Sequence, residues 1–245
     1  MSEVIRRGTL YIISTPIGNL EDISVRAINI LSGVDLIAAE DTRTTKILLD
    51  HYNIHKPLIS YFSYNEMRRI PELITKLKSG VSIGLVSDAG TPGISDPAYR
   101  IIRAALDEEL PLVMIPGPTA FLPALITSGL SSERFLFMGF LPSKKGRRTM
   151  FEELRKEDRT IILYESPHRL LRTLSDLKEF LGDRNISISR ELTKKFEETI
   201  RGKISELIAH FSKNSPRGEF VLIIEGRTDK KLMKNRSHPQ IRYRR

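Results

Sequence analysis

The 245-residue sequence contains no cysteine, which excludes disulfide bonds, thiolate nucleophiles and cysteine-ligated zinc sites. It also lacks an apolar stretch of about 18 to 20 residues, the length that a membrane-spanning helix needs. The first residues lack the apolar run of a signal peptide. Hydrophobic residues make up 40% of the chain and charged residues 28%, as in ordinary globular proteins. We therefore expect a soluble cytoplasmic protein with one large domain or two modest ones.

Three common ligand-binding patterns are absent as well. No G-x-x-x-x-G-K-[ST] segment occurs, which excludes a phosphate-cradling P-loop. The first expected strand is followed by Thr15-Pro-Ile-Gly-Asn19, where a dinucleotide-binding protein would have G-x-G-x-x-G. His51 and His55 have helical spacing, but no carboxylate motif accompanies them, so no metal site is expected.

The net charge of +9 is unevenly distributed along the chain. Residues 227–245 hold eight Lys or Arg against one Asp, which leaves residues 1–226 with a net charge of only +2. This basic tail suits an arm that neutralises phosphates, and it equally suits a solvated terminus. A second basic group lies after the expected strand at 135–140 and consists of Lys144, Lys145, Arg147 and Arg148. Together with the tail, these four residues are expected to bind the phosphates of a nucleic acid such as RNA, and a solvated loop is the alternative.

Strand-like and helix-like runs alternate along the whole chain. The first series of apolar strands covers residues 10–14, 35–39, 58–61, 81–86 and 112–115, with amphipathic helical runs between them. A second series covers 135–140, 160–164, 186–190, 198–202 and 219–225. This alternation predicts an α/β protein with mainly parallel and mixed sheets. We expect two lobes, at residues 1–118 and 119–226, followed by the tail at 227–245.

Four loops of the first lobe follow strands, at residues 15–19, 39–43, 88–93 and 116–120. The carboxyl ends of parallel strands meet at one edge of a sheet, where ligands of α/β proteins bind. Gly90 and Gly93 would let main chain approach a ligand closely. Asp96 and Pro97 predict an N-cap followed by a proline in the first turn of a helix. No lysine lies in these loops, which favours a zwitterionic, adenosine-bearing ligand over a triphosphate.

Six segments together resemble a known family. Residues 14–22, 39–43, 87–97, 116–120, 164–169 and 190–194 are similar to those of the tetrapyrrole methylase superfamily. More narrowly, they resemble its branch of bacterial small-subunit (16S) ribosomal RNA (cytidine 2′-O)-methyltransferases. The glycine-rich first loop of the tetrapyrrole enzymes is replaced here by residues 15–19, which speaks against a corrin-type substrate and matches the RNA branch.

The resemblance implies a homodimer of two α/β lobes that binds S-adenosylmethionine in the cleft between them. The reaction would be 2′-O-methylation of a cytidine ribose in 16S ribosomal RNA, with the small ribosomal subunit as partner. Carried over by position, the donor contacts are Asp88, Ala89, Gly90, Ile94, Pro118, Thr119 and Ala120, with Tyr164, Glu165 and Phe220 from the second lobe.

A ribose hydroxyl is a poor nucleophile when neutral, so a base or a charge-stabilising group is expected. The catalytic candidates are Glu40, Asp41, Arg43, Glu191 and Lys194. The sequence does not rank them, and Asp41 is also placed to cap the next helix. Two alternatives stay open: a small-molecule methylase of the tetrapyrrole type, and a non-catalytic RNA-binding protein on the same scaffold.

Overall fold

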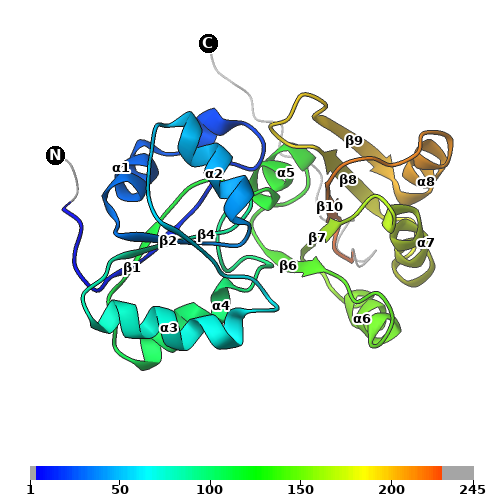
Figure 1. Cartoon of the computed structure of the whole chain (residues 1–245). Coiled ribbons are helices and arrows are strands. Elements are labelled where there is room, and N and C mark those ends of the chain that lie inside the picture. The colour runs from blue at the N-terminus through cyan, green and yellow to red at the C-terminus, as the bar shows by residue number, and fades with distance from the viewer. Residues whose placement is uncertain (1–3, 228–245) are drawn as a thin grey trace, which may run out of the picture. The chain divides into compact units, whose positions relative to one another are not determined.

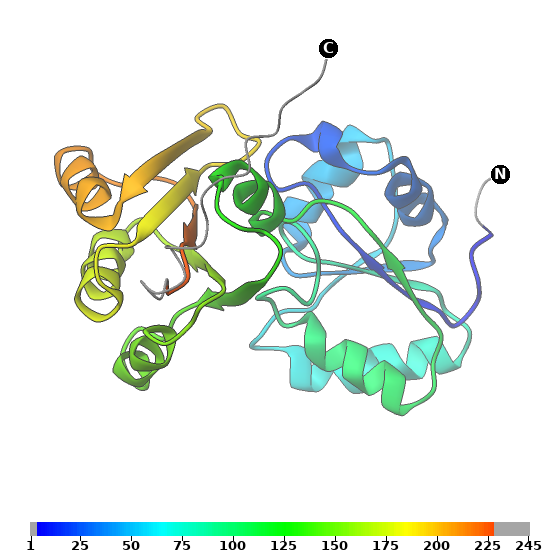
Figure 2. The same cartoon turned by 180° about the vertical axis from the view of Figure 1, so that it is seen from behind.

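The structure is a computed structural model that describes residues 4–227 (Figures 1 and 2). Its contacts divide the chain into two units. Within the described residues, the first consists of 4–123 together with Glu191–Glu197, and the second of Ala124–Arg190 together with 198–227. The boundary drawn by contacts thus differs from the expected lobes, because residues 119–123 and 191–197 belong to the first unit. The basic tail lies outside the described residues from position 228 onward.

The first unit contains a parallel sheet whose strand order is β3-β2-β4-β1-β5. The strands are β1 (Leu10–Ile13), β2 (Leu36–Ala39), β3 (Leu58–Ser60), β4 (Ile83–Val86) and β5 (Leu112–Ile115). These runs are almost entirely apolar, as expected for strands that helices cover on both faces.

Two helices pack on each face of this sheet (Figure 1). Helices α1 (Val25–Gly33) and α2 (Thr42–His51) cover one face, and α3 (Glu66–Lys78) and α4 (Ala98–Asp107) cover the other. Side chains alternate along β1, so that Tyr11 packs with the first helix pair and Leu10 with the second. A short 3-10 helix, η1 (Leu20–Asp22), lies between β1 and α1.

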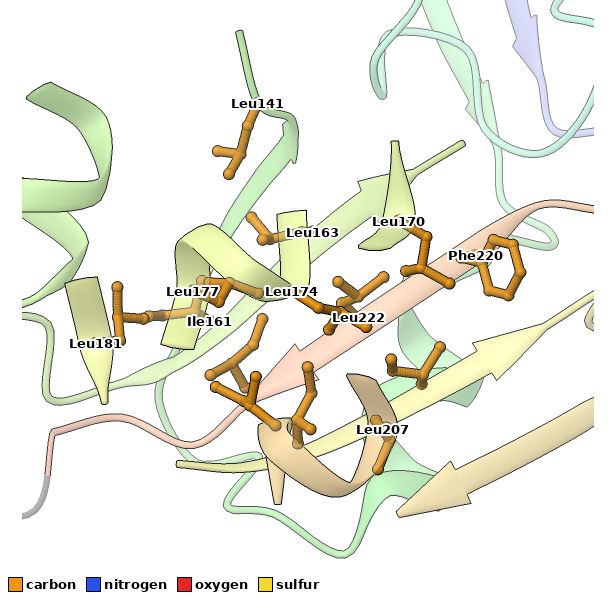
Figure 3. Packing of buried hydrophobic residues seen from close by; sticks show 14 of the residues in the cluster. Leu141, Ile161, Leu163, Leu170, Leu174, Leu177, Leu181, Leu207, Phe220 and Leu222 are labelled. Carbon is orange, nitrogen blue, oxygen red and sulfur yellow. The ribbon is translucent and has the colours of Figure 1, made fainter. Parts of the chain in front are cut away.

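The second unit contains a mixed sheet of order β6-β7-β10-β8-β9, in which only β6 and β7 are parallel. The strands are β6 (Phe135–Phe140), β7 (Thr160–Glu165), β8 (Asn185–Arg190), β9 (Glu198–Lys203) and β10 (Phe220–Ile224). Helices α6 (Arg147–Leu154), α7 (Leu170–Leu181) and α8 (Ile204–Lys213) contribute to one shared apolar core with this sheet, part of which Figure 3 shows. Helix α5 (Phe121–Ser128) spans the boundary between the units.

The predicted fold class is confirmed: an α/β chain with one parallel and one mixed sheet. Element ends differ from the prediction by a few residues. Helix α7, for example, begins only at Leu170, since a turn closed by the Arg169 N–H and the Ser166 carbonyl precedes it. Among the described helices, none combines the length and the apolar character that crossing a bilayer would require.

Candidate active site

The loops after β1 and β4 are joined by main-chain hydrogen bonds at the carboxyl edge of the first sheet. The Thr15 N–H donates to the Gly90 carbonyl (2.8 Å), and the Gly90 N–H donates to the Thr15 carbonyl (3.0 Å). The Thr15 hydroxyl also donates to the Ser87 carbonyl (3.1 Å). The two loops therefore form one rigid ledge at the point where β1 and β4 end.

Thr91 ties the loop after β5 to this ledge. Its hydroxyl lies 3.0 Å from the Ser14 hydroxyl and donates to the Pro118 carbonyl at 3.0 Å. Gly117 approaches so closely that a Cβ there would lie 2.8 Å from the Ser14 Cβ. Three of the four predicted ligand loops are thus held together by contacts within the first unit.

Gly90 has a conformation that requires glycine. Its φ is +83°, and a Cβ at this position would lie 3.3 Å from Cγ2 of Ile17. Left-handed backbone is unfavourable for residues that carry a Cβ. The residues just before it, Asp88 and Ala89, are exposed, so their main chain is accessible to a ligand.

The segment after Gly90 starts α4 in a different way from the prediction. Asp96 accepts hydrogen bonds from the N–H groups of Gly93 and Ala98 (2.8 Å each). The helix begins at Ala98, with Pro97 at the capping position. Asp96 therefore satisfies a helix N–H as expected, but Pro97 lies before the first turn and not within it.

Two carboxylates meet beside the ledge. The Asp88 N–H donates to Oε2 of Glu40 (3.3 Å), and the Asp41 N–H donates to Oδ1 of Asp88 (2.8 Å). Burial raises the pKa of Glu40, and the neighbouring negative charges of Asp88 and Asp96 raise it further. Asp88 is exposed as a residue, but partial desolvation of its carboxylate raises its pKa as well. Desolvated carboxylates of this kind favour a proton or a nearby cation.

The pKa of Asp41 is shifted in the opposite direction to that of its neighbour Glu40. Its carboxylate pairs with the Arg43 guanidinium at 2.6 Å and accepts the Arg43 N–H at 2.8 Å, where it caps α2. These bonds lower the pKa of Asp41 to about 2. Asp41 and Arg43 therefore largely satisfy each other, and Asp41 is a weak proton acceptor at neutral pH.

The candidates Glu191 and Lys194 lie in the segment 191–197, which returns to the first unit. Their side chains form an ion pair at 3.0 Å. Glu191 and Thr193 have φ values of 50° and 65°, and the Thr193 hydroxyl accepts the N–H of Asn19 (3.1 Å). This segment therefore packs on the loop after β1, where a Cβ on Gly18 would collide with the Lys194 side chain.

The donor contacts expected from the second unit are largely engaged within that unit. Phe220 is 2% exposed and points into the apolar core beside Leu170 and Leu222 (Figure 3). Glu165 is equally buried and accepts hydrogen bonds from the Thr173 hydroxyl (2.6 Å) and the Ser166 N–H (2.8 Å). Burial removes both side chains from a ligand, so a donor contact at these two positions stays a prediction for their main chain alone.

Tyr164 differs from these two residues, since its side chain is only half-buried. It packs against the rings of Phe137 and Phe140, with centroid distances of 5.2 and 5.6 Å.

The four residues of the predicted basic group also differ in exposure. Lys144, Lys145 and Arg148 are exposed. The Arg147 side chain is only 6% exposed, and its guanidinium donates to Asp176 at 2.8 Å and to Thr173 at 2.9 Å. The prediction that Arg147 binds RNA is therefore corrected, because its donors are already used inside the second unit.

A cavity of about 340 Å³ at the same sheet edge was missed by sequence reasoning. Glu40 and Asp96 connect it to the ledge, and its wall also includes Ser63, Glu66, Tyr99 and Arg100. These residues come from the loop after β3 and from the first turns of α3 and α4. The aromatic pair Phe62 and Tyr64 after the third strand was the available signal, since exposed aromatic side chains next to a sheet edge are typical of binding surfaces.

The sequence profile of the family described as "Tetrapyrrole (Corrin/Porphyrin) Methylases" matches residues 9–208. The chain belongs to this family. It is 52% identical over 223 residues to "Ribosomal RNA small subunit methyltransferase I" of Synechocystis sp.. The matched residues make up 90% of this chain and 80% of that relative. It is 48% identical to the protein of the same name from Thermotoga maritima, over 90% of this chain and 99% of the relative.

Solved structures of tetrapyrrole methylases share the fold. A uroporphyrin-III-C-methyltransferase from Thermus thermophilus matches with a TM-score of 0.62 and 17% identity, over 89% of this chain and 94% of that structure. A cobalt precorrin-4 methyltransferase matches with a TM-score of 0.68 and 15% identity, over 91% and 98%. At such low identity these two structures support the fold alone.

Proposed function

We propose that this methyltransferase transfers a methyl group from S-adenosylmethionine to the 2′-oxygen of a cytidine ribose in small-subunit (16S) ribosomal RNA. The observation that carries the proposal is the identity of about 50% with proteins named "Ribosomal RNA small subunit methyltransferase I", over nine-tenths of the chain. The ribose 2′-oxygen as the methylated atom and cytosine as the base are taken from the resemblance of the six segments to the RNA branch. The tetrapyrrole alternative rests on the broad family description and on structures of 15–17% identity, and no feature of the site favours it.

The carboxyl edge of the first sheet fits a zwitterionic donor. Glu40 and Asp88 have pKa values that burial raises, and a neighbouring positive charge stabilises such carboxylates. The glycines at 90 and 117 bring main chain close to the place where the loops meet. We assign donor binding to the exposed main chain of residues 88–90 together with Ile94 and Pro118–Ala120. S-adenosylmethionine supplies an electrophilic methyl group on a sulfonium, so the chemistry needs no metal.

Glu40 is our choice for the group that receives the hydroxyl proton. Its proton affinity is raised, its Oε2 contacts the loop assigned to the donor, and its side chain reaches the adjoining cavity. A base is most effective when its pKa lies near the working pH. Asp41, with a pKa of about 2, meets this condition less well. We place Asp88 and the Glu191–Lys194 pair in positioning roles around the loops.

Binding of RNA would use the exposed cations Lys144, Lys145 and Arg148. Lysine and arginine that neutralise phosphates give an affinity that falls steeply with salt. The proposal includes the small ribosomal subunit as the partner, a homodimeric enzyme and a cytoplasmic location. The subunit and the homodimer rest on the resemblance to the RNA branch, and the location follows from the proposed ribosomal RNA substrate.

The test is methyl transfer from radiolabelled S-adenosylmethionine to isolated small ribosomal subunits and, separately, to deproteinised ribosomal RNA. We expect label at one internucleotide bond that resists alkaline hydrolysis, since a 2′-O-methyl group removes the attacking hydroxyl. The Asp88→Ala variant should lose donor binding in calorimetry while it keeps the circular dichroism spectrum of the wild type. Donor binding without label in either RNA would refute the proposal.

A further inference from the structure

The cavity at the carboxyl edge of the first sheet has the size of a small-molecule site and a largely polar wall. Its volume of about 340 Å³ lies at the lower end of the range typical of ligand pockets, about 300 to 1,000 Å³. The ledge assigned to the methyl donor adjoins it through Glu40, which accepts the Asp88 N–H. A molecule in this cavity would therefore lie next to the donor loops of the same unit.

One part of the wall presents a hydrogen-bond acceptor next to a donor. Oε1 of Glu66 lies 3.3 Å from Nε of Arg100, and Nη1 of Arg100 is 3.2 Å from the sulfur of Met67. Glu66 is 8% exposed, whereas the Arg100 side chain is 57% exposed. The pair is thus anchored by a buried carboxylate, and the guanidinium extends toward solvent.

The other polar groups of the wall have different roles. Both carboxylate oxygens of Asp96 accept the Gly93 N–H, and one also accepts the Ala98 N–H. Asp96 therefore shapes the wall but has little remaining capacity to bind a ligand. Tyr99, next to Arg100 in the wall, is 67% exposed, which makes it available for stacking.

We propose that this cavity holds the acceptor cytidine of the RNA, with the base read by Glu66 and Arg100 and stacked on Tyr99, and the ribose beside Glu40. This inference rests on the proposed function and adds the residues that select the base. Cytosine presents an amino donor at N4 next to acceptors at N3 and O2. A carboxylate beside a guanidinium complements that edge, because the carboxylate accepts from N4 and the guanidinium donates to N3 or O2.

Uracil has the opposite pattern at the same two positions. Its O4 would face the Glu66 carboxylate, and its N3–H would face the Arg100 guanidinium, so acceptor meets acceptor and donor meets donor. Because the base edge is occupied in the cavity, the target nucleotide must be unpaired or flipped out of its helix when it binds.

The experiment locates the labelled nucleotide in the wild-type reaction and then replaces it by uridine in reconstituted small subunits. Single-turnover methyl transfer is compared for the two RNAs. We expect the wild type to prefer cytidine by about 10- to 100-fold, the discrimination that one well-placed base contact gives. The Glu66→Gln variant should reduce this preference several-fold, since an amide can either accept from N4 or donate to O4.

Two further variants keep the test independent of folding effects at the buried Glu66. Tyr99→Ala should lower the rate on both RNAs by about 10- to 100-fold, because base stacking does not depend on sequence. Arg103→Ala is the matched control for charge on α4: Arg103 pairs with Asp107 and does not line the cavity, so its rates should equal those of the wild type. Donor binding by calorimetry should be unchanged in all three variants.

The outcomes separate the two proposals. Equal wild-type rates on cytidine and uridine would overturn the cavity assignment alone, because methyl transfer would still occur. An unchanged preference in Glu66→Gln with wild-type rates in Tyr99→Ala would also overturn it. Absence of any label from the wild type would overturn both the assignment and the function on which it rests.

Discussion

Removal of the Arg147 side chain should destabilise the second unit and leave RNA binding intact. The guanidinium donates to Oδ2 of Asp176 (2.8 Å), to the Pro142 carbonyl (3.0 Å) and to the Thr173 hydroxyl (2.9 Å). The Thr173 hydroxyl in turn donates to Oε2 of Glu165 (2.6 Å). In Arg147→Ala all three acceptors lose their donor within a buried network.

The magnitude follows from burial. Breaking a buried ion pair costs about 3–5 kcal/mol, because the remaining charge stays without its partner. The Asp176 side chain is 25% exposed, so water can solvate part of it and the lower end of that range applies. We expect Arg147→Ala to lower the free energy of unfolding by about 3 kcal/mol.

The neighbouring Arg148 is the matched control. Its side chain is 81% exposed and pairs with Glu152 one turn along α6. Exposed pairs of this kind contribute about 0.3–0.5 kcal/mol, and the Arg148 guanidinium also lies 5.8 Å from the centroid of the Phe180 ring. Arg148→Ala should therefore lower stability by about 1 kcal/mol or less. It should instead reduce the slope of log affinity for RNA against log salt by about one, since it removes one phosphate contact.

Urea unfolding followed by circular dichroism measures the first effect, and filter binding at several salt concentrations measures the second. Equal stability losses in the two variants, or a loss below about 1 kcal/mol in Arg147→Ala, would refute the buried network as a source of stability. If the slope of log affinity for RNA against log salt falls in Arg147→Ala at a temperature where this variant is folded, Arg147 contacts RNA.

Two further predictions concern the carboxyl edge of the first sheet. Gly90→Ala should cost about 1–2 kcal/mol of stability and weaken S-adenosylmethionine binding in calorimetry, because φ is +83° and Ile17 leaves little room; unchanged affinity would exclude this loop from the donor site. Glu40→Gln should stabilise the protein at pH 7, because a raised pKa means that the fold disfavours the ionised carboxylate. This gain in stability should disappear as the pH falls below the pKa of a glutamate in the unfolded chain, about 4.3. Asp41→Asn should instead destabilise the protein at pH 7. The stability that the lowered pKa of Asp41 provides is present above the pKa of the unfolded chain and is lost as the pH falls toward about 2. Urea unfolding at pH 7 and pH 4 measures both variants, and stability changes of equal sign would contradict the assigned environments.

The strands and the ligand loops of the first unit could be predicted from local pattern. Its strands are short apolar runs bounded by polar or glycine-containing loops, and parallel strands place their carboxyl ends at one edge. The contacts between Thr15 and Gly90 and between Glu40 and Asp88 follow from that rule. Local sequence sets these positions because each residue comes directly after its strand.

Positions that depend on packing between distant elements could not be predicted in the same way. Glu66 and Arg100 meet because α3 and α4 lie on the same face of the sheet. No pattern in the local sequence predicts that residues 191–197 return to the first unit either. Arg147 is an intermediate case: it precedes Phe151 by four residues and Leu154 by seven, and both are buried, so helical periodicity could have placed it on the inner face.

Glu40 and Asp41 lie in opposite environments at this sheet edge, and these environments suit one to stabilising the fold and the other to the reaction. Asp41 is ionised, paired with Arg43 and bonded at the start of α2, so its charge stabilises the fold that holds the loops. Glu40 has one hydrogen bond, from the Asp88 N–H, and a pKa that burial raises, so its ionised form destabilises that fold. A residue that lowers stability at neutral pH persists where activity needs it. Because Glu40 faces both the donor loop and the cavity, the strain of its charge is relieved when it receives a proton from a hydroxyl bound there, which is the event that ribose methylation requires.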